Sequence, residues 1–200
     1  RFVNELTKIK PKSYYAYTKH MSEKIIKKFS RKYNISYGIF RYFNVAGADT
    51  SGKIGEINSS HGHLIKNISV QSLKKKPIIK IYGNNYPTRD GTPVRDYIHI
   101  SDLVDIHKKG LNYLKKYNKS FTLNCGYGKG YSVLEIFNIS KKYIKNLSFV
   151  YDKKRTGDAS EIYSDTRKLK KLLKWKPKYN NIKSIIKSSI NFEKKFFTKN

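Results

Sequence analysis

The sequence has one cysteine, one methionine, one tryptophan and only 14 acidic side chains among its 200 residues. The single cysteine, Cys125, cannot form an internal disulfide and fits a reducing compartment. No apolar run approaches the roughly 20 residues that a membrane-spanning helix needs. The first residues also lack the pattern of a signal peptide. These absences predict a cytoplasmic protein that does not contact a membrane.

Two kinds of site are also excluded. The CGYGKG segment at 125–130 lacks the Gly-Lys-Ser or Gly-Lys-Thr ending of a phosphate-binding loop, so we interpret it as a strand-to-helix turn. His61, His63, His99 and His107 do not fall at metal-ligand spacing on one predicted element, and there is no second cysteine. The sequence therefore predicts no metal site.

The excess of basic residues gives a formal net charge of +29. Such a charge is typical of proteins that bind nucleic acid or anionic surfaces. Lysine, however, supplies 36 of the 43 basic residues, whereas bidentate recognition of phosphates and base edges favours arginine. Lysine runs such as 74–76 and 168–174 fall where amphipathic helices would face solvent. Solvated helix faces are favoured, and a non-enzymatic basic module that binds nucleic acid or other anions remains the alternative.

The order of predicted elements is that of an α/β protein. Apolar residues at Met21, Ile25 and Phe29 share one helical face and predict a helix over 15–34. The β-rich segment 36–45 follows as a buried strand, which indicates the end of an α/β unit with a parallel sheet. Ligands gather at the carboxyl ends of such strands, so residues 43–48 are a candidate ligand-facing edge.

The rest of the chain continues this alternation. Ser101 is expected to cap a helix, and Ser132 with Glu135 matches a capping box. Helices are predicted at 63–73, 101–116, 132–145, 166–173 and from 182, and strands at 78–82, 94–100, 121–124 and 147–151.

Segment 86–103 combines restricted turn residues, a strand and a helix start around Arg95. A turn this constrained can hold the planar guanidinium in place to bind a phosphate or carboxylate. Alternatively, Arg95 pairs with Asp90 or Asp96 across the loop. These residues alone support the anion-binding and the ion-pair interpretations of Arg95 equally.

Two further pairs could carry chemistry. Tyr15 and Lys19 stand four apart on a predicted helix and so share a face. A phenol titrates near pH 10 and becomes a base at neutral pH only when a cation, here Lys19, stabilises the phenolate. The alternative is that the two residues form an exposed helix pair without a chemical role. Arg155 and Asp158 lie in a glycine-containing turn that could clamp an anion and accept from a hydroxyl, or form a local ion pair.

Taken in order, these segments resemble the UDP-glucose 4-epimerase family of the extended short-chain dehydrogenase/reductase class. The resemblance runs from about Pro11 to the last helix, and it matches the C-terminal portion of that enzyme. Its motifs are YAYTK (15–19), RYFNVAGAD (41–49), HLI (63–65), IYGNNYPTRDGTPVRDYIHISDL (81–103) and KRTGD (154–158), with Asp165 and LKKLLKWKP (169–177) completing the order.

The resemblance implies an isomerase that interconverts UDP-glucose and UDP-galactose with NAD as cofactor. In this family C4 is oxidised, the 4-keto sugar rotates, and the sugar is reduced again. Tyr15 is implied to be the catalytic base and acid. Lys19 is implied to hold the nicotinamide ribose and stabilise the Tyr15 phenolate, and Phe43 to lie near the nicotinamide.

The resemblance also implies a substrate site. Arg95 and Arg155 are expected to bind the diphosphate and Asp158 the uridine ribose. Ile162 stands where side-chain size governs tolerance of N-acetyl sugars in the family. Asn44, His63 and Leu64 are implied to contact the UDP-sugar. The segment of Lys80, Ile81 and Tyr82 is implied to flank the uracil.

The implied fold is the later part of a Rossmann-like doubly wound parallel sheet plus a small α/β nucleotide-sugar-binding domain. We expect 1–48 and 94–125 to belong to the NAD-binding domain, and 49–93 and 126–200 to the substrate domain. The chain begins at Arg1 and lacks the glycine-rich dinucleotide turn and the Ser or Thr that partners the catalytic tyrosine. We therefore expect an N-terminally incomplete chain, inactive alone and a homodimer when full length.

Two departures from the family pattern are visible around Tyr15, where Tyr14 and Ala16 replace a proline and a glycine.

The alternative to a UDP-glucose 4-epimerase within the superfamily is another nucleotide-sugar epimerase or dehydratase.

Overall fold

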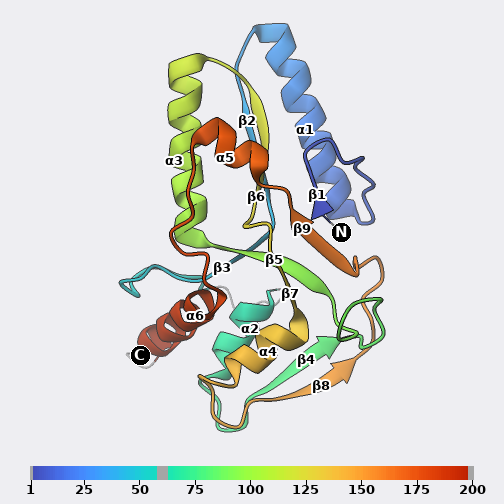
Figure 1. Cartoon of the computed structure of the whole chain (residues 1–200), viewed down its shortest axis with the longest axis vertical. Helices are drawn as coiled ribbons and strands as arrows, with labels where there is room; N and C mark the ends of the chain where they lie inside the picture. Colours follow the sequence, from blue (N-terminus) through green and yellow to red (C-terminus); the bar gives the residue numbers. More distant parts are fainter. Residues whose placement is uncertain (1, 58–62, 198–200) are drawn as a thin grey trace.

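The computed structural model describes residues 2–57 and 63–197 (Figure 1). Its elements in chain order are β1 (Phe2–Val3), α1 (Tyr14–Tyr33), β2 (Gly38–Tyr42), β3 (Asn44–Ala46), α2 (Leu64–Gln71), β4 (Ile78–Tyr82), β5 (Val94–His99), α3 (Ile100–Tyr117), β6 (Phe121–Cys125), β7 (Gly130–Ser132), α4 (Val133–Ser140), β8 (Ser148–Asp152), β9 (Glu161–Ser164), α5 (Arg167–Leu173) and α6 (Ile182–Phe197).

Strand pairing is mostly parallel, as expected for an α/β fold. β5 lies at the centre of the largest sheet, between β3 and β9, both parallel to it, and β1 extends this sheet beyond β9. β2 pairs with β6, and β4 pairs with β8, again in parallel. Among the strands of the described residues, only β7 is antiparallel, and it pairs with the first half of β5. The prediction of a parallel α/β fold is confirmed.

The elongated molecule has two parts (Figure 1). In the upper part of the view, α1 and α3 lie on either side of β2 and β6. The lower part holds α2, α4 and α6 with the β4–β8 pair. β5 runs between them and contributes to both cores, because successive strand residues point to opposite faces. Tyr97 packs in the lower core and Ile98 in the upper one.

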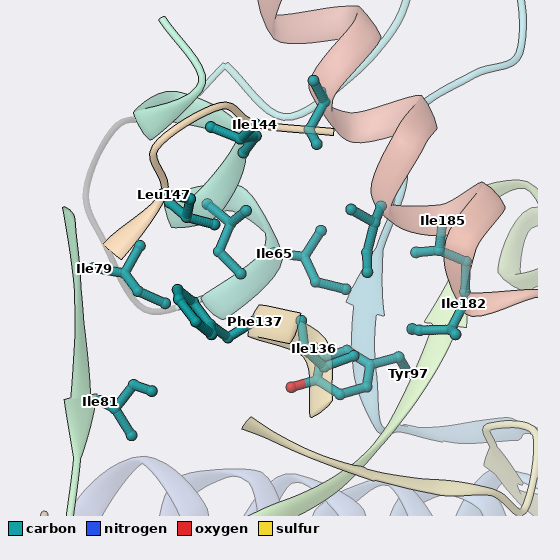
Figure 2. Close-up of a cluster of buried hydrophobic side chains, with 13 residues drawn as sticks. Ile65, Ile79, Ile81, Tyr97, Ile136, Phe137, Ile144, Leu147, Ile182 and Ile185 are labelled. Atoms are coloured by element: carbon teal, nitrogen blue, oxygen red, sulfur yellow. The ribbon is translucent and has the colours of Figure 1, made fainter. Parts of the chain in front are cut away.

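The lower core is built from isoleucines on four elements. Figure 2 shows side chains of β4, α2, α4 and α6 pointing into one interior, with Ile65 and Ile136 near its middle. Ile65, Ile68, Ile136 and Ile186 are at most 1% exposed. Burial of apolar surface stabilises a fold by about 25 cal/mol per Å², so this cluster is a main source of stability for the lower part.

The upper core joins Ile98 and Leu103 to residues of β6 and to Leu169 and Trp175 near the end of the chain. α5 therefore packs on the upper part, although it falls in the range 126–200 that we expected to form the substrate domain. The domain boundaries themselves stay a prediction.

Several sequence predictions of local structure need correction. The strand expected at 36–45 is divided into β2 and β3, which pair with different partners. The helix expected at 132–145 ends at Ser140. The turn at 125–130 leads into β7, and β1 and β9 were not predicted. Short strands of two to four residues carry too little periodicity to be recognised.

The helix caps explain two boundaries. Ser132 and Glu135 form the predicted capping box at the start of α4. Ser101 is not the cap of α3, because the helix begins at Ile100 and the buried His99 ring accepts from the Ser101 N–H at 3.1 Å. Within residues 2–57 and 63–197, no helix combines the length and apolar character needed to cross a membrane.

Candidate functional site

A cleft of about 170 Å³ lies beside the centre of the largest sheet. It is bounded by strands β3, β4 and β5, the first turns of α2 and α4, and the loop between β8 and β9. Its lining residues are Asn44, Leu64, Asn67, Lys80, Tyr82, Pro93, Arg95, Tyr97, Val133, Arg155 and Asp158. Segments far apart in the sequence thus converge on one concave surface.

Arg95 forms the charged centre of the cleft. Its side chain is only 14% exposed, and the guanidinium lies 3.2 Å from the Asp158 carboxylate. It also donates to the Val94 carbonyl at 2.9 Å. A partly buried guanidinium beside a cavity can bind an anion strongly, because little water competes for its N–H groups.

The two acids that we considered as partners of Arg95 have other roles. Asp90 accepts from the Thr92 N–H at 2.9 Å and from the Ser132 hydroxyl, which fixes the loop against the start of α4. Asp96 is fully buried and accepts from the N–H groups of Tyr127 and Gly128, each at 2.9 Å. The interpretation in which Arg95 pairs with Asp90 or Asp96 is therefore wrong.

A second arginine of the cleft lining packs against an aromatic ring. The Arg155 guanidinium carbon lies 3.9 Å from the centroid of the Tyr82 ring, a cation–π contact. The third cation of the lining, Lys80, is paired as Arg95 is: its ammonium group bonds Asp152 at 3.0 Å, and that contact raises the pKa of the lysine. Arg95 and Arg155 are the two arginines of the cleft lining, and a guanidinium there is suited to an anion.

Four lining residues were not predicted from the sequence: Asn67, Pro93, Tyr97 and Val133. Burial raises the pKa of Tyr97, so its hydroxyl stays neutral. Asn67 stands three residues after Leu64, and this helical spacing from a predicted contact was the one signal that could have identified it. Tyr97 stands two residues after Arg95 on β5, so strand alternation could have placed it on the same face.

Some predicted substrate contacts lie outside the cleft lining. The Ile81 side chain points into the lower core and is 0% exposed, because it alternates with Lys80 and Tyr82 along β4. His63 precedes α2, 3.4 Å from the Glu56 carboxylate, and lines a neighbouring hollow. Ile162 is in register with Arg95 on β9 and is half-buried.

Phe43 sits in the short break between β2 and β3, where its N–H donates to the Cys125 carbonyl at 3.1 Å. It is half-buried. This position is beside Asn44, the first cleft residue of β3.

The predicted catalytic pair lies on an open helix face. The Tyr15 side chain is 72% exposed, and the Lys19 ammonium lies 5.3 Å from its ring centroid. α1 has no buried residue, although Ile25, Phe29 and Tyr33 are large and apolar. The structure thus brings Tyr15 and Lys19 together, but not into the lining of the cleft.

Arg41 fixes α1 to the sheet. Its guanidinium donates two bonds of 2.7 Å to the Glu23 carboxylate, one turn beyond Lys19 on the helix. It also donates to the Glu5 carbonyl at 3.1 Å. The Arg41 contact lowers the pKa of Glu23, so the pair is ionised at neutral pH. The arginine of the RYFN segment therefore positions the helix that carries Tyr15.

A larger and more apolar hollow of about 580 Å³ lies at the carboxyl end of β3. Val45, Ile54, Ile100 and Val104 line it, with Asp49 and Glu56 at its polar side. In the part of the chain that the structure describes, no three His, Cys, Asp or Glu side chains group closely enough to hold a metal ion.

A cleft beside an α/β sheet that joins two arginines, an aromatic ring and carboxamides has the composition of a site for a nucleotide or another organic anion. A sequence model described as the NAD dependent epimerase/dehydratase family matches residues 3–126. The chain belongs to this family.

Known relatives agree with this assignment. The chain is 37% identical to a UDP-glucose 4-epimerase of Lactobacillus helveticus, over 96% of this chain and 58% of the relative. It is 38% identical to a putative UDP-arabinose 4-epimerase of Arabidopsis thaliana, over 96% of this chain and 47% of that protein. The chain spans about half the length of the curated relatives it matches.

The fold is also similar to that of a solved enzyme. A crystal structure of the UDP-glucose 4-epimerase of Stenotrophomonas maltophila, with bound NAD and formylated UDP-arabinopyranose, superposes with a TM-score of 0.93 at 27% identity. The match covers 99% of this chain and 60% of that one. The predicted resemblance to UDP-glucose 4-epimerases, over part of their length, is confirmed.

Proposed function

We propose that this chain carries the nucleotide-sugar site and the catalytic tyrosine of an NAD-dependent UDP-glucose/UDP-galactose 4-epimerase. The observation that carries the proposal is the cleft, which gathers seven of the residues implied by the family resemblance from five separate segments. Arg95 and Arg155 bind the diphosphate. Asp158 accepts from the ribose, and Asn44 with Leu64 contacts the sugar side.

In this proposal Tyr15 takes the proton from the sugar 4-hydroxyl and returns it at the end of the cycle. Lys19 stabilises the phenolate by its positive charge, since it lies 5.3 Å from the Tyr15 ring. Arg41 and Glu23 keep α1 in the orientation that this transfer requires. The protein thereby supplies the base, the orientation and the phosphate contacts.

The residues present fit part of the cofactor. Tyr15 and Lys19 face open space on α1, where a nicotinamide ribose could reach both side chains, and Phe43 lies near the nicotinamide in this proposal. NAD, when bound, supplies the redox chemistry by accepting and returning a hydride. The sequence holds no glycine-rich turn for its pyrophosphate. We therefore propose that these 200 residues do not turn over by themselves.

The direct experiment is to change Tyr15→Phe in the full-length protein and to measure both UDP-galactose turnover and UDP binding. Turnover should fall by about 10²-fold or more, because the variant lacks the proton-transfer group, while UDP binds as before. Tyr17→Phe, two residues along the same helix, is the matched control. Unchanged turnover in Tyr15→Phe would reject the assignment.

The sugar range is a separate question. UDP-pentoses are the second candidate substrates, because one relative is a putative UDP-arabinose 4-epimerase and a similar structure holds a UDP-arabinopyranose derivative. A 4,6-dehydratase or UDP-glucuronate epimerase remains the alternative activity. Parallel assays with UDP-galactose, UDP-arabinose and UDP-glucuronate distinguish these possibilities by the product formed.

We also propose that the full-length protein is a cytoplasmic homodimer. The exposed apolar side chains of α1 support an interface there, and the single buried cysteine fits a reducing compartment. Sedimentation of the full-length protein and of an Ile25→Lys, Phe29→Lys variant tests the interface. The variant should sediment as a monomer.

A further inference from the structure

One hydroxyl close to the cleft is buried without a hydrogen-bond partner. Tyr86 lies in the loop between β4 and β5, yet only 4% of it is exposed. Its hydroxyl forms no hydrogen bond with any residue in the described ranges 2–57 and 63–197. Tyr127 shows the usual arrangement, because its phenol donates to the Asp102 carboxylate at 2.6 Å. A buried hydroxyl without a partner destabilises the fold, so its presence points to a partner that it gains in another state of the site.

The Tyr86 ring is held in place from two sides. Its own N–H donates to the Gly91 carbonyl at 2.9 Å, which closes the loop into a tight turn. Gly91 has φ +75°, and a Cβ atom there would overlap the Asn84 carbonyl, so the turn depends on glycine at this position. On the other side, the Lys154 ammonium lies 4.0 Å from the ring centroid, a cation–π contact from the loop after β8. The hydroxyl therefore has a fixed position.

Three charged groups of the cleft act on the Tyr86 phenol. Burial is the largest cause of its raised pKa, and the Asp158 carboxylate raises that pKa further. Arg95 and Arg155 act in the opposite direction without cancelling the shift. The hydroxyl therefore keeps its proton at neutral pH and is a donor. A guanidinium cannot accept a hydrogen bond, so Asp158 is the acceptor among these three groups.

Asp158 also connects the hydroxyl with the ligand site. Its side chain lines the cleft, while Tyr86 is not among the lining residues. The Asp158 carboxylate lies 3.2 Å from Arg95, and the Asp158 side chain is 35% exposed, so neighbouring atoms do not enclose it. A diphosphate that binds Arg95 displaces this carboxylate, which then faces a second negative charge and needs a new partner.

We propose that the Tyr86 hydroxyl donates a hydrogen bond to the Asp158 carboxylate once a diphosphate has replaced that carboxylate on Arg95, an inference that rests on the proposed function. A carboxylate has two oxygens with about four acceptor sites, so Asp158 can accept from Tyr86 and from a ribose hydroxyl together. The new bond offsets part of the cost of opening the Arg95–Asp158 pair. Tyr86 is thus a positioning residue, which acts on the ligand through Asp158.

The experiment is a calorimetric titration of the full-length protein with inorganic pyrophosphate and with UDP. Tyr86→Phe removes only the hydroxyl and should weaken pyrophosphate binding by about 3- to 30-fold, because the displaced carboxylate loses its donor. UDP binding should weaken by at least as much, since Asp158 is then also less well oriented for the ribose. Tyr117→Phe, at an exposed position on α3, is the matched control and should bind both ligands as wild type does.

A double-mutant cycle assigns the effect to Asp158. In an Asp158→Ala background no carboxylate is displaced, so adding Tyr86→Phe should change pyrophosphate affinity by less than about 2-fold. Thermal unfolding without ligand should give Tyr86→Phe a midpoint equal to or above that of wild type, because the hydroxyl has no bond to lose. In turnover assays Tyr86→Phe should raise the KM for UDP-galactose more than it lowers kcat. A purely structural role of Tyr86 would not give this combination.

The outcomes separate this inference from the proposed function. Unchanged pyrophosphate affinity in Tyr86→Phe overturns the role of Tyr86. An equal loss in the wild-type and Asp158→Ala backgrounds also overturns it, because the hydroxyl would then contact the ligand directly. A Tyr86→Phe protein that is clearly less stable than wild type without ligand does the same, since its hydroxyl must have another partner. Wild type that binds pyrophosphate but not UDP rejects the proposed function alone, and wild type that binds neither ligand rejects both.

Discussion

The Arg95 guanidinium and the Asp158 carboxylate lie 3.2 Å apart, joining strand β5 to the loop before β9. The proposed function assigns these two groups to different parts of one ligand, the diphosphate and the ribose. Without ligand each satisfies the charge of the other. A diphosphate that binds Arg95 must therefore displace the Asp158 carboxylate, which then becomes free to accept from a hydroxyl.

The first prediction concerns this competition. Asp158→Asn removes the negative charge that occupies Arg95, so inorganic pyrophosphate should bind about 2- to 10-fold more tightly than to wild type. Titration calorimetry with pyrophosphate measures this change. Asp105→Asn on α3 alters the net charge equally and should change pyrophosphate affinity much less than Asp158→Asn does. Weaker pyrophosphate binding to Asp158→Asn would contradict the competition.

The second prediction concerns the pair that holds the catalytic helix. The folded-state pKa of Glu23 is lowered mainly by its hydrogen bond with Arg41, so the pair stabilises the fold above the ordinary carboxyl pKa near 4.5. This contribution is lost as the pH falls through the lowered pKa. Glu23→Gln should cost about 1–3 kcal/mol at pH 7 and much less at pH 3.

Denaturant unfolding of wild type and Glu23→Gln at the two pH values measures this difference. Lys24→Gln, next to Glu23 and exposed, is the control and should change stability by less than about 0.5 kcal/mol. A loss in Glu23→Gln that is as large at pH 3 as at pH 7 would show that charge pairing is not its cause.

The third prediction concerns the turn after β3. Gly47 has φ +87°, and a Cβ atom there would lie 2.5 Å from the buried His99 ring. Gly47→Ala should therefore cost about 2–4 kcal/mol, the sum of left-handed strain and steric overlap. At Gly52, φ is +66° but a Cβ would meet only the flexible Lys195 side chain at 3.2 Å.

Gly52→Ala is thus the matched control, expected to cost about 1–2 kcal/mol from strain alone. Thermal unfolding of the two variants gives the comparison. Equal losses in the two variants would mean that the His99 contact has no energetic effect.

Local sequence patterns predicted the long elements well. The periodic apolar residues of α1 and the capping box of α4 require only neighbouring residues, and the structure has both. β7 and β9 were missed because their pairing with β5 depends on residues distant in the sequence. Their positions matter, since β9 places Ile162 in register with Arg95.

The site was predictable only in part for the same reason. Arg95 could be recognised as a candidate from its constrained loop, but its partner could not, because Asp90 and Asp96 are closer in sequence than Asp158. Those two acids are occupied by hydrogen bonds to Ser132 and to the turn at 127–128, which no local pattern reveals. Asn67 was missed because an asparagine within a helix gives no signal of the cavity beside it.

The central claim is that the cleft around Arg95 binds a uridine diphosphate group. Its most direct test is titration of UDP into wild type, Arg95→Ala and Arg89→Ala, the last being an arginine of the same loop that pairs with Glu135. We predict that Arg95→Ala lowers the affinity for UDP by about 10-fold or more. Arg89→Ala should bind UDP with the affinity of wild type, and this affinity should change little between low and high salt. Equal binding by both variants, or binding that disappears steeply with salt in all three proteins, would contradict the account and favour a non-specific basic surface.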